Sequence, residues 1–389
     1  MAVTVRKLFM DAGWRYGARL VAGEKGLDNL VDWIHILEDP KVAGFLRGQE
    51  VVLTAGILYQ GEQWLFDLAE SLCEEEISAF VVNLGPHIRE IPETVKEFCD
   101  REAMPLYVVP WKTHMVDMTR AFGQTLFEDR SKEQDIVSSV KNLIFGTGTQ
   151  EEQVQVLERH GFRLNYPWTF VILSPASDER AAGTGDEDGL LLRIGTRLAE
   201  EMHPGMSAHF HYRDNLVFLL VNFTDEEIEK YVDAYQAELK RDHLLENVQI
   251  GIGENIAGAA AQGENFERAF AVSCLARRRK KRVYYYKELD IERLLIEIHD
   301  TALLKKYYHD TIGRLLDYDQ QNGTKWYEFL RVYLEKDGSP QAVSEELFIH
   351  RNTVGNYLKK VENILGLEKM GQKERVGLYL AYQVADLLL

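Results

Sequence analysis

Cysteine is scarce in this sequence, and long apolar runs are absent. The three cysteines among 389 residues are widely spaced and form no CxxC pair, which argues against a disulfide framework or a zinc site and favours reduced thiols. The longest apolar runs, such as Leu216–Val221, are too short to span a bilayer. The first residues contain no apolar signal-peptide core. We therefore expect a cytoplasmic protein that has no membrane contact, metal ion or cofactor.

Positive charges are outnumbered by negative ones, which gives a formal net charge of −17. The length of 389 residues suggests two or three domains, each with its own core. The formal charge is −8 for residues 1–130, −8 for 131–299 and −1 for 300–389, whereas residues 349–375 carry +3. DNA binding requires a local basic face rather than a basic protein. The acidic remainder would weaken the binding of a lone protomer to DNA, which favours a dimer.

Residues 339–366 contain the local signals of two short helices. Ser339 is a favourable N-cap, and Pro340 suits the first helical position because its missing N–H would have no partner there. A second helix is predicted to begin near Arg351 and to end at Gly366, where a C-terminal cap belongs. Two short helices joined by about three residues, of which the second is longer and basic, indicate a helix-turn-helix.

The polar face of the second predicted helix has residue types that contact DNA. Arg and Asn can read base edges bidentately, Thr can reach a base or a phosphate, and Lys mostly neutralises phosphate. The first turns of a recognition helix point into the major groove. The base-reading candidates are Arg351, Asn352, Thr353 and Asn356, the backbone candidates are Lys359 and Lys360, and His350 and Tyr357 complete the predicted DNA-binding set. The alternative is a surface helix hairpin with a solvated polar face, or one that binds protein.

Residues 1–123 alternate short apolar runs with helical patterns, which predicts an α/β domain with a mostly parallel sheet. The predicted strands are Val31–Ile36, Glu50–Thr54, Ala79–Asn83 and Leu106–Val109. Ligands of such sheets bind outside the carboxyl ends of the strands. The predicted ligand-binding residues at this edge, which we call the carboxyl rim, are Glu38, Thr54, Gly56, Asn83, Gly85 and Trp111. The alternative is a set of ordinary strand-to-helix turns, which use the same residue types.

Residues 113–145 show a helical pattern, and a long helix between domains often serves as a dimer seam or a lever. Residues 166–287 are predicted to form a second α/β domain, with an order of helices and strands similar to a nucleotide-cyclase-type fold. The basic run at residues 277–282 ends a predicted helix, which favours a solvated turn over a phosphate contact. His209 and His211 share one strand face, but the sequence offers no third metal ligand nearby.

Three strings near the C-terminus form a recognisable pattern: Leu316-Asp317-Tyr318-Asp319, Asn322-Gly323-Thr324 and Leu347-Phe348-Ile349-His350-Arg351-Asn352-Thr353. They resemble the C-terminal domain of PucR-type transcriptional regulators, a family named for purine catabolism. Trp33-Ile34-His35-Ile36-Leu37-Glu38 and the segment Leu46–Thr54 are similar to the N-terminal sensory domain of that family. The middle segment, with Ile250-Gly251-Ile252-Gly253, is similar to its GGDEF-like domain.

This resemblance implies a ligand-responsive transcription factor, often an activator of a nearby catabolic operon, whose effectors are small metabolites such as purine breakdown products, amino acids or sugar acids. Two departures from the family matter. Gly355 lies close to a position where the family usually has Arg, which predicts an atypical operator or a close approach of the backbone to DNA. No GGDEF motif occurs, and the corresponding hairpin reads Tyr212-Arg213-Asp214-Asn215. Cyclases hold metal and nucleotide through that acidic turn, so no catalytic residues are expected.

These observations predict a homodimeric regulator that binds double-stranded DNA and a small-molecule effector, either a purine-like compound or an amino acid. The predicted parts are an α/β sensing domain (1–123), a helical linker (124–165), a degenerate cyclase-like α/β domain (166–287) and an all-α domain (288–389) with the helix-turn-helix at 339–366. The alternative function is that of a nucleotide-binding or cyclase-like signalling protein acting through the middle domain.

Overall fold

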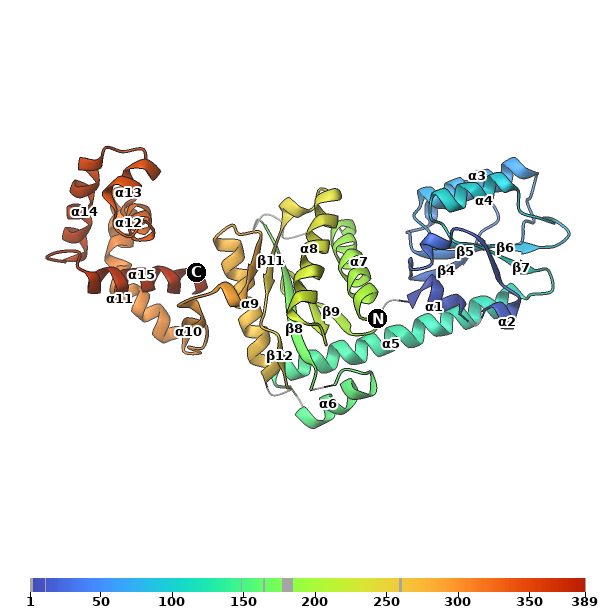
Figure 1. Ribbon diagram of the computed structural model, residues 1–389, viewed down its shortest axis with the longest axis horizontal. Helices are drawn as coiled ribbons and strands as arrows, with labels where there is room; N and C mark the ends of the chain where they lie inside the picture. The colour runs from blue at the N-terminus through green and yellow to red at the C-terminus, as the bar shows by residue number, and fades with distance from the viewer. Residues whose placement is uncertain are drawn as a thin grey trace.

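The computed structural model arranges the chain as three lobes in a row, with the N-terminal lobe at one end and the C-terminal lobe at the other (Figure 1). It describes residues 3–10, 12–147, 149–163, 165–176, 185–258 and 261–388. The first two lobes combine helices and a sheet, and the third is helical. The predicted mixed α/β N-terminal region and helical C-terminal region are therefore confirmed.

The N-terminal domain is built on a five-stranded sheet with the order β2-β7-β6-β5-β4. Its strands are β2 (Arg19–Ala22), β4 (Trp33–Ile36), β5 (Glu50–Thr54), β6 (Ala79–Leu84) and β7 (Leu106–Pro110). Strands β4 to β7 are parallel and follow one another in chain order, whereas β2 pairs antiparallel with β7. The sequence predicted the parallel strands but missed β2. It also merged β4 with β3 (Leu30–Val31), which pairs separately with β1 (Val3–Thr4).

Helices cover both faces of this sheet. Alternate residues of a strand point to opposite faces, and Val52 and Phe80 accordingly pack under η2 (Pro40–Phe45), α3 (Glu62–Glu74) and α4 (Glu93–Arg101). The other face, with Val51 and Leu53, packs against α1 (Val5–Phe9), α2 (Ala12–Tyr16) and the first half of α5 (Met115–Phe145). The segments that connect β4, β5, β6 and β7 all lie on the first of these two faces of the sheet. The order of these four strands therefore never reverses.

Helix α5 belongs to two cores. Its first half contributes Met118 and Phe122 to the N-terminal domain, and its second half contributes Ile136 and Val140 to the middle domain. Figure 1 shows it running without a break beneath both lobes. The predicted helix is thus present, and residues predicted as a linker take part in the core of the middle domain.

The middle domain has a sheet of order β13-β11-β8-β10-β9, with β12 paired to β8. The strands are β8 (Pro167–Pro175), β9 (Ser207–Tyr212), β10 (Asn215–Val221), β11 (Val248–Ile252), β12 (Ile256–Ala257) and β13 (Val283–Tyr285). Helices α7 (Gly185–Met202) and α8 (Asp225–Arg241) cover one face. The second half of α5, α6 (Gln150–Arg159) and α9 (Gln262–Arg278) cover the other. The predicted β9–β10 hairpin is present, and Arg213 in its turn has a φ of +52°.

The C-terminal domain consists of α10 (Glu292–Ile296), α11 (Thr301–Asn322), α12 (Trp326–Glu335), α13 (Pro340–Glu346), α14 (Arg351–Leu365) and α15 (Gln372–Leu388). Its core joins buried side chains of the five longer elements, including Leu315, Leu330, Val343, Val361 and Ala381. Helix α15 packs along α11, and its last turns also contact α10 and reach α9 of the middle domain. The orientation of the helix-turn-helix therefore depends on how α15 docks.

A buried cluster of charged and polar side chains forms this docking contact, and we call it the hub. Asp386 accepts hydrogen bonds from Arg331 Nη2 at 2.9 Å and from Arg279 Nε at 3.4 Å. Arg279 also donates to Glu292 at 2.5 Å and to Gln383. Burial raises the pKa of Glu292, but hydrogen bonds from the backbone and from Arg279 outweigh it and hold that pKa below its ordinary value. Arg279 of the basic run therefore joins two domains.

Candidate functional site

The helix-turn-helix is capped as its sequence predicts. The Ser339 hydroxyl accepts a hydrogen bond from the Ala342 N–H, and Pro340 occupies the first turn of α13. Helix α14 ends at Gly366, which adopts the left-handed conformation with a φ of +74°. In the turn between the helices, Phe348 has a φ of +53° and is 96% exposed. A large apolar side chain is unusual in this conformation.

His350 is the N-cap of the recognition helix. Its Nδ1 accepts a hydrogen bond from the Asn352 N–H at 3.2 Å, which satisfies one of the free N–H groups at the start of α14. The sequence suggested a DNA contact for His350 and did not reveal this capping role. The cap fixes the direction in which the first turn of α14 points.

The two faces of α14 separate as predicted. Val354, Val361 and Leu365 are buried in the domain core. The exposed residues on the opposite side are Arg351, Asn352, Gly355, Asn356, Lys359 and Lys360, and Thr353 is half-buried beside them. An ideal Cβ on Gly355 would meet nothing within 4 Å, so this surface has free space at that point.

Tyr357 is held by aromatic packing rather than projecting freely from the helix. Its ring makes edge contacts with Trp326 at 5.0 Å and with Phe329 at 5.4 Å between centroids. A DNA contact by this residue stays a prediction, restricted to its hydroxyl group. Lys360 lies over the Tyr318 ring at 5.3 Å, which leaves its ammonium group at the surface.

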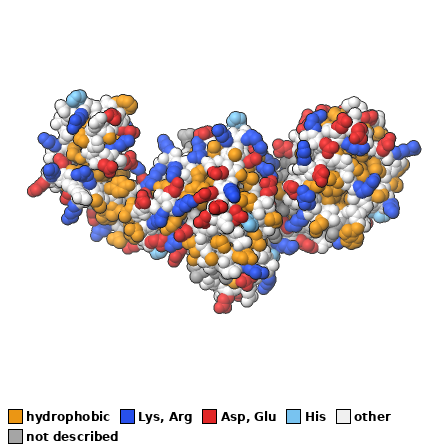
Figure 2. Space-filling view, in the orientation of Figure 1, with side chains coloured by type: hydrophobic (Ala, Val, Ile, Leu, Met, Phe, Trp, Pro, Cys, Tyr) orange, Lys and Arg blue, Asp and Glu red, His pale blue; other side chains and the backbone are white. Residues whose placement is uncertain are grey.

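Two basic residues of α14 differ from most charged side chains of this protein. Within the described part of the chain, neither Arg351 nor Lys359 forms an ion pair. On the face shown in Figure 2, by contrast, acidic and basic side chains are mixed over the middle lobe. Guanidinium and ammonium groups without an internal partner are suited to phosphate and base contacts.

At the carboxyl rim of the N-terminal domain, Glu38 is occupied by internal hydrogen bonds. Its carboxylate accepts from the Thr54 hydroxyl at 3.1 Å, the Ala55 N–H at 2.7 Å and the Ile57 N–H at 2.8 Å. The Gly56 N–H donates to the Thr54 hydroxyl at 3.2 Å. The backbone groups that an anionic ligand would need at this point are therefore already bound.

The second part of the rim gathers Asn83, Gly85 and Trp111. Trp111 lies directly over Gly85, where an ideal Cβ would be 2.4 Å from the indole ring, and it remains 48% exposed. The His87 ring contacts Trp111 edge-on at 5.7 Å. Asn83 is buried, and its Oδ1 has no hydrogen-bond partner. The structure thus brings the predicted rim residues to one edge, with one unsatisfied acceptor.

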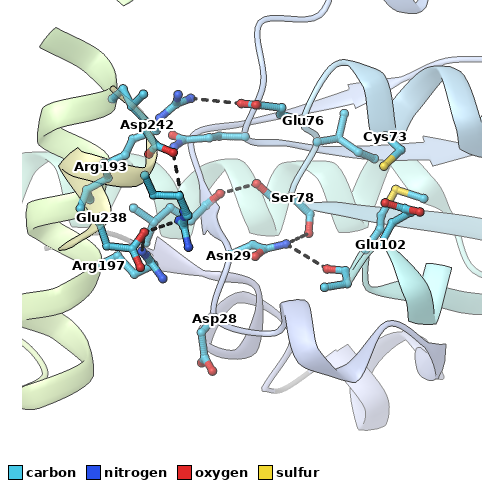
Figure 3. Close-up of a pocket in the computed structure, with 18 residues that line it drawn as sticks. Asp28, Asn29, Cys73, Glu76, Ser78, Glu102, Arg193, Arg197, Glu238 and Asp242 are labelled. Atoms are coloured by element: carbon cyan, nitrogen blue, oxygen red, sulfur yellow. Dashed lines mark hydrogen bonds and ion pairs between the residues drawn. The ribbon is translucent and has the colours of Figure 1, made fainter. Parts of the chain in front are cut away.

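A cleft that the sequence did not predict lies at the amino ends of the same parallel strands, opposite the carboxyl rim. It has a volume of about 410 Å³ and lies between the amino ends of β5, β6 and β7 and helices α7 and α8 of the middle domain (Figure 3). Arg193 and Arg197 project from the α7 wall, and Glu76, Ser78 and Glu102 lie on the N-terminal wall. Arg193 Nη1 is 3.8 Å from Glu76 Oε2 across the cleft.

The middle domain lacks the acidic turn of a cyclase. In the β9–β10 turn, the Arg213 guanidinium lies over the rings of Tyr212 and Phe270, at 5.4 Å from each. His209 Nε2 is 3.3 Å from Glu133 on α5, and burial lowers the pKa of this histidine although Glu133 opposes the shift. His211 is exposed. No group of three or more His, Cys, Asp or Glu side chains in the described residues could hold a metal ion.

Cys73, Cys99 and Cys274 are free, and burial raises the pKa of Cys99 to about 12, which makes its thiolate scarce at neutral pH. Among the helices described, none is long and apolar enough to cross a membrane.

Two family models match the chain. Residues 10–126 match the purine catabolism regulatory protein-like family, and residues 326–384 match the PucR C-terminal helix-turn-helix domain. The first match covers most of the N-terminal domain, and the second covers α12 to α15. The two matches occur in the order that the sequence resemblance predicted. Neither of these two matches covers the middle domain, whose GGDEF-like identity stays a prediction.

Three curated proteins of Bacillus subtilis are similar to this chain. The proline-responsive transcriptional activator PutR is 22% identical over 64% of this chain and 62% of its own length. The DNA-binding transcriptional activator AdeR is 22% identical over 43% of this chain and 41% of its own length. The purine catabolism regulatory protein is 26% identical over 46% of this chain and 35% of its own length. The matched segments span less than two thirds of each relative. The N-terminal domain and the helix-turn-helix thus each match a domain of PucR-type regulators.

Proposed function

We propose that this protein is a transcriptional activator that binds DNA as a homodimer and responds to a small metabolite. The observation that carries the proposal is the exposed polar face of α14, in a domain that matches the PucR helix-turn-helix. Two of the similar proteins are named as transcriptional activators, which favours activation over repression. PutR is named as proline-responsive and a third relative as a purine catabolism regulatory protein, which favours an amino acid or a purine breakdown product as the effector.

The DNA contact is tested by replacing base-reading residues. Arg351→Ala and Asn352→Ala each remove a side chain that we assign to a base edge, and each base contact is worth about 1–3 kcal/mol. We expect operator affinity to fall by about 5–150-fold in each variant without loss of folding. Lys359→Ala should weaken binding to any sequence and reduce the salt slope by about one unit, because it removes a phosphate contact.

The assay is fluorescence anisotropy on the DNA upstream of the gene, compared with a scrambled duplex over a salt series. Lys305→Ala provides a matched control, since this lysine is exposed on α11 and outside the recognition helix. Equal and weak binding of the wild-type protein to both duplexes would contradict the proposal. Unchanged affinity in Arg351→Ala and Asn352→Ala would show that α14 is not the reading helix.

For the middle domain we infer a degenerate cyclase-like fold without catalysis. The strand order with its central antiparallel β8 and the β9–β10 hairpin support this assignment. The hairpin turn carries Arg213, whose positive charge opposes the metal ions that cyclases bind there. The two family matches favour regulation over catalysis. Metal-dependent turnover of ATP or GTP by the purified protein would instead support the cyclase alternative.

The dimer supplies a mechanism for the response. Two recognition helices must lie about one DNA turn apart, roughly 34–36 Å, to contact both half-sites. We propose that effector binding changes this spacing through α5, because that helix is shared by the sensing domain and the middle domain. Crosslinks between the two protomers whose spacing is the same with and without effector would contradict this mechanism.

The effector site has two candidates in the N-terminal domain. The carboxyl rim offers Asn83 and Trp111, while its Glu38 end is satisfied by the protein itself. The cleft of Figure 3 offers charged groups from two domains. Effector-binding experiments with Trp111→Ala and with substitutions of cleft residues distinguish these two candidate sites.

A further inference from the structure

The cleft between the N-terminal and middle domains has the dimensions of a metabolite site. Its volume of about 410 Å³ lies within the range of about 300–1,000 Å³ that is usual for ligand pockets. It adjoins a second hollow of about 690 Å³, which shares Asp28, Leu30 and Arg197 with it. Interfaces between domains are frequent positions for such sites.

Charges of opposite sign face each other across this cleft. Arg193, Arg197 and Arg241 line the middle-domain wall, and Glu76 and Glu102 line the N-terminal wall (Figure 3). Arg197 and Arg241 both contact Glu238 on their own wall, at 3.2 Å in the case of Arg197. Arg193 is different because its ion-pair partner, Glu76, lies on the other domain.

The pair between Arg193 and Glu76 is loose. Its atoms are 3.8 Å apart, and the two side chains are 34% and 75% exposed. Such exposed pairs contribute little to stability, because solvent screens them and both side chains keep their mobility. A ligand that supplies a carboxylate to Arg193 and a cation to Glu76 can therefore replace this contact and make two charge-assisted hydrogen bonds.

The cleft also has apolar walls and a hydrogen-bonded floor. Leu190 and Ile194 of α7 face Ile77 and Met104 from the sensing domain. On the floor, the Asn29 side-chain amide donates to the carbonyl oxygens of Ser78 and Ala103, at 3.4 Å each. An apolar side chain of the ligand would be buried beside the charged groups. A pocket that combines apolar walls with a few charged groups fixes the orientation of a small ligand.

We propose that this cleft binds a zwitterionic α-amino acid, with its carboxylate at Arg193, its ammonium at Glu76 and its side chain against Leu190 and Ile77. The ligand joins the sensing domain to the middle domain in place of the loose ion pair. The regulatory role of this site rests on the proposed function, because only in a regulator is the bound amino acid an effector.

The proposal is tested by isothermal titration of the full-length protein with the standard L-amino acids, each tested singly, and with succinate and allantoin as dianionic and uncharged probes. We expect at least one amino acid to bind and the two other probes not to bind. Glu76→Gln and Arg193→Gln should each weaken that binding by about tenfold or more, as expected when a charge-assisted hydrogen bond is lost.

Two control variants locate the site. Lys96→Gln removes an exposed ion pair with Glu93 on α4, outside the cleft, and should leave the binding unchanged. Trp111→Ala alters the carboxyl rim and should also leave it unchanged. The proposal is overturned if no amino acid binds. It is also overturned if binding is lost in Trp111→Ala but kept in Glu76→Gln and Arg193→Gln, because the ligand would then occupy the rim.

Operator binding, measured by anisotropy with and without the amino acid, separates this inference from the proposed function. Specific DNA binding without any amino-acid binding would retain the regulator and reject the cleft as its sensor. Amino-acid binding that depends on Glu76 and Arg193, without specific DNA binding, would retain the site and reject the regulator.

Discussion

Replacing Asp386 with asparagine should loosen the contact between the C-terminal domain and the middle domain. The Asp386 carboxylate is 4% exposed and accepts from Arg331 of α12 and from Arg279 at the end of α9. Asparagine keeps the size of the side chain but removes the negative charge. Both guanidinium groups then lose their common partner at the hub.

The size of the effect follows from burial. Removing one partner of a buried ion pair costs about 3–5 kcal/mol, but Arg279 and Arg331 are 24% and 34% exposed, so solvent partly compensates for the lost charge. We therefore expect the docking of α15 to weaken by about 2–3 kcal/mol. This corresponds to amide exchange about 30–150-fold faster in the last turns of α15.

Hydrogen exchange of individual amides measures this local opening without requiring two-state unfolding of a three-domain chain. Glu335→Gln is the matched control, because Glu335 contacts the same Arg331 at 2.9 Å but is 51% exposed. This exposed i,i+4 pair is worth about 0.3–0.5 kcal/mol, so exchange should change by less than about threefold. Equal effects of Asp386→Asn and Glu335→Gln would refute the reasoning that burial makes the hub strong.

Two further predictions concern the helix-turn-helix. Phe348→Gly should stabilise the C-terminal domain by about 0.5–1 kcal/mol, because glycine relieves the positive φ and the exposed ring has little packing to lose; a lower thermal midpoint would contradict this. Gly355→Ala should stabilise free α14 by about 0.5–1 kcal/mol, because the added methyl meets no atom. If operator affinity falls in the same Gly355→Ala protein, the backbone of α14 approaches DNA closely at that point, whereas unchanged affinity would exclude such an approach.

The sequence predicted the helix-turn-helix well because its signals are local. Ser339, Pro340 and Gly366 act through hydrogen bonds and backbone angles within one or two turns of a helix, so their residue types suffice. The role of Tyr357 was not predictable in this way. Its packing against Trp326 depends on how α12 crosses α14, which is a tertiary contact.

The carboxyl rim was placed by a general rule, and its role in ligand binding stays a prediction. Ligands bind at the carboxyl edge of open α/β sheets where the strand order reverses and two loops diverge. Here β4, β5, β6 and β7 lie in chain order, so no reversal creates a crevice among them. Strand order is not encoded in any short segment of sequence. The composition of the turns therefore suggested a site that Glu38 and Trp111 partly fill.

The interdomain cleft was beyond sequence reasoning for a different reason. Glu76 and Arg193 lie in separate domains, and each belongs to a helix end or helix face that is ordinary on its own. Only the path of α5 brings the amino edge of one sheet against α7 of the next domain. The long helix was thus predicted from its helical pattern, while the surfaces that it brings together were not.

Packing provides a continuous route from the cleft to the recognition helix. Helix α5 lies against α9, where an ideal Cβ on Gly263 would be 3.1 Å from the Ile144 carbonyl oxygen, so the two helices have little room to move independently. We therefore expect a rotation of the N-terminal domain, whose core includes Phe122 of α5, to be transmitted to α9. Helix α9 ends at Arg278, and its C-cap residue Arg279 contacts Asp386 in the hub. It follows that Asp386→Asn should weaken the response to effector while the DNA-reading face of α14 stays intact.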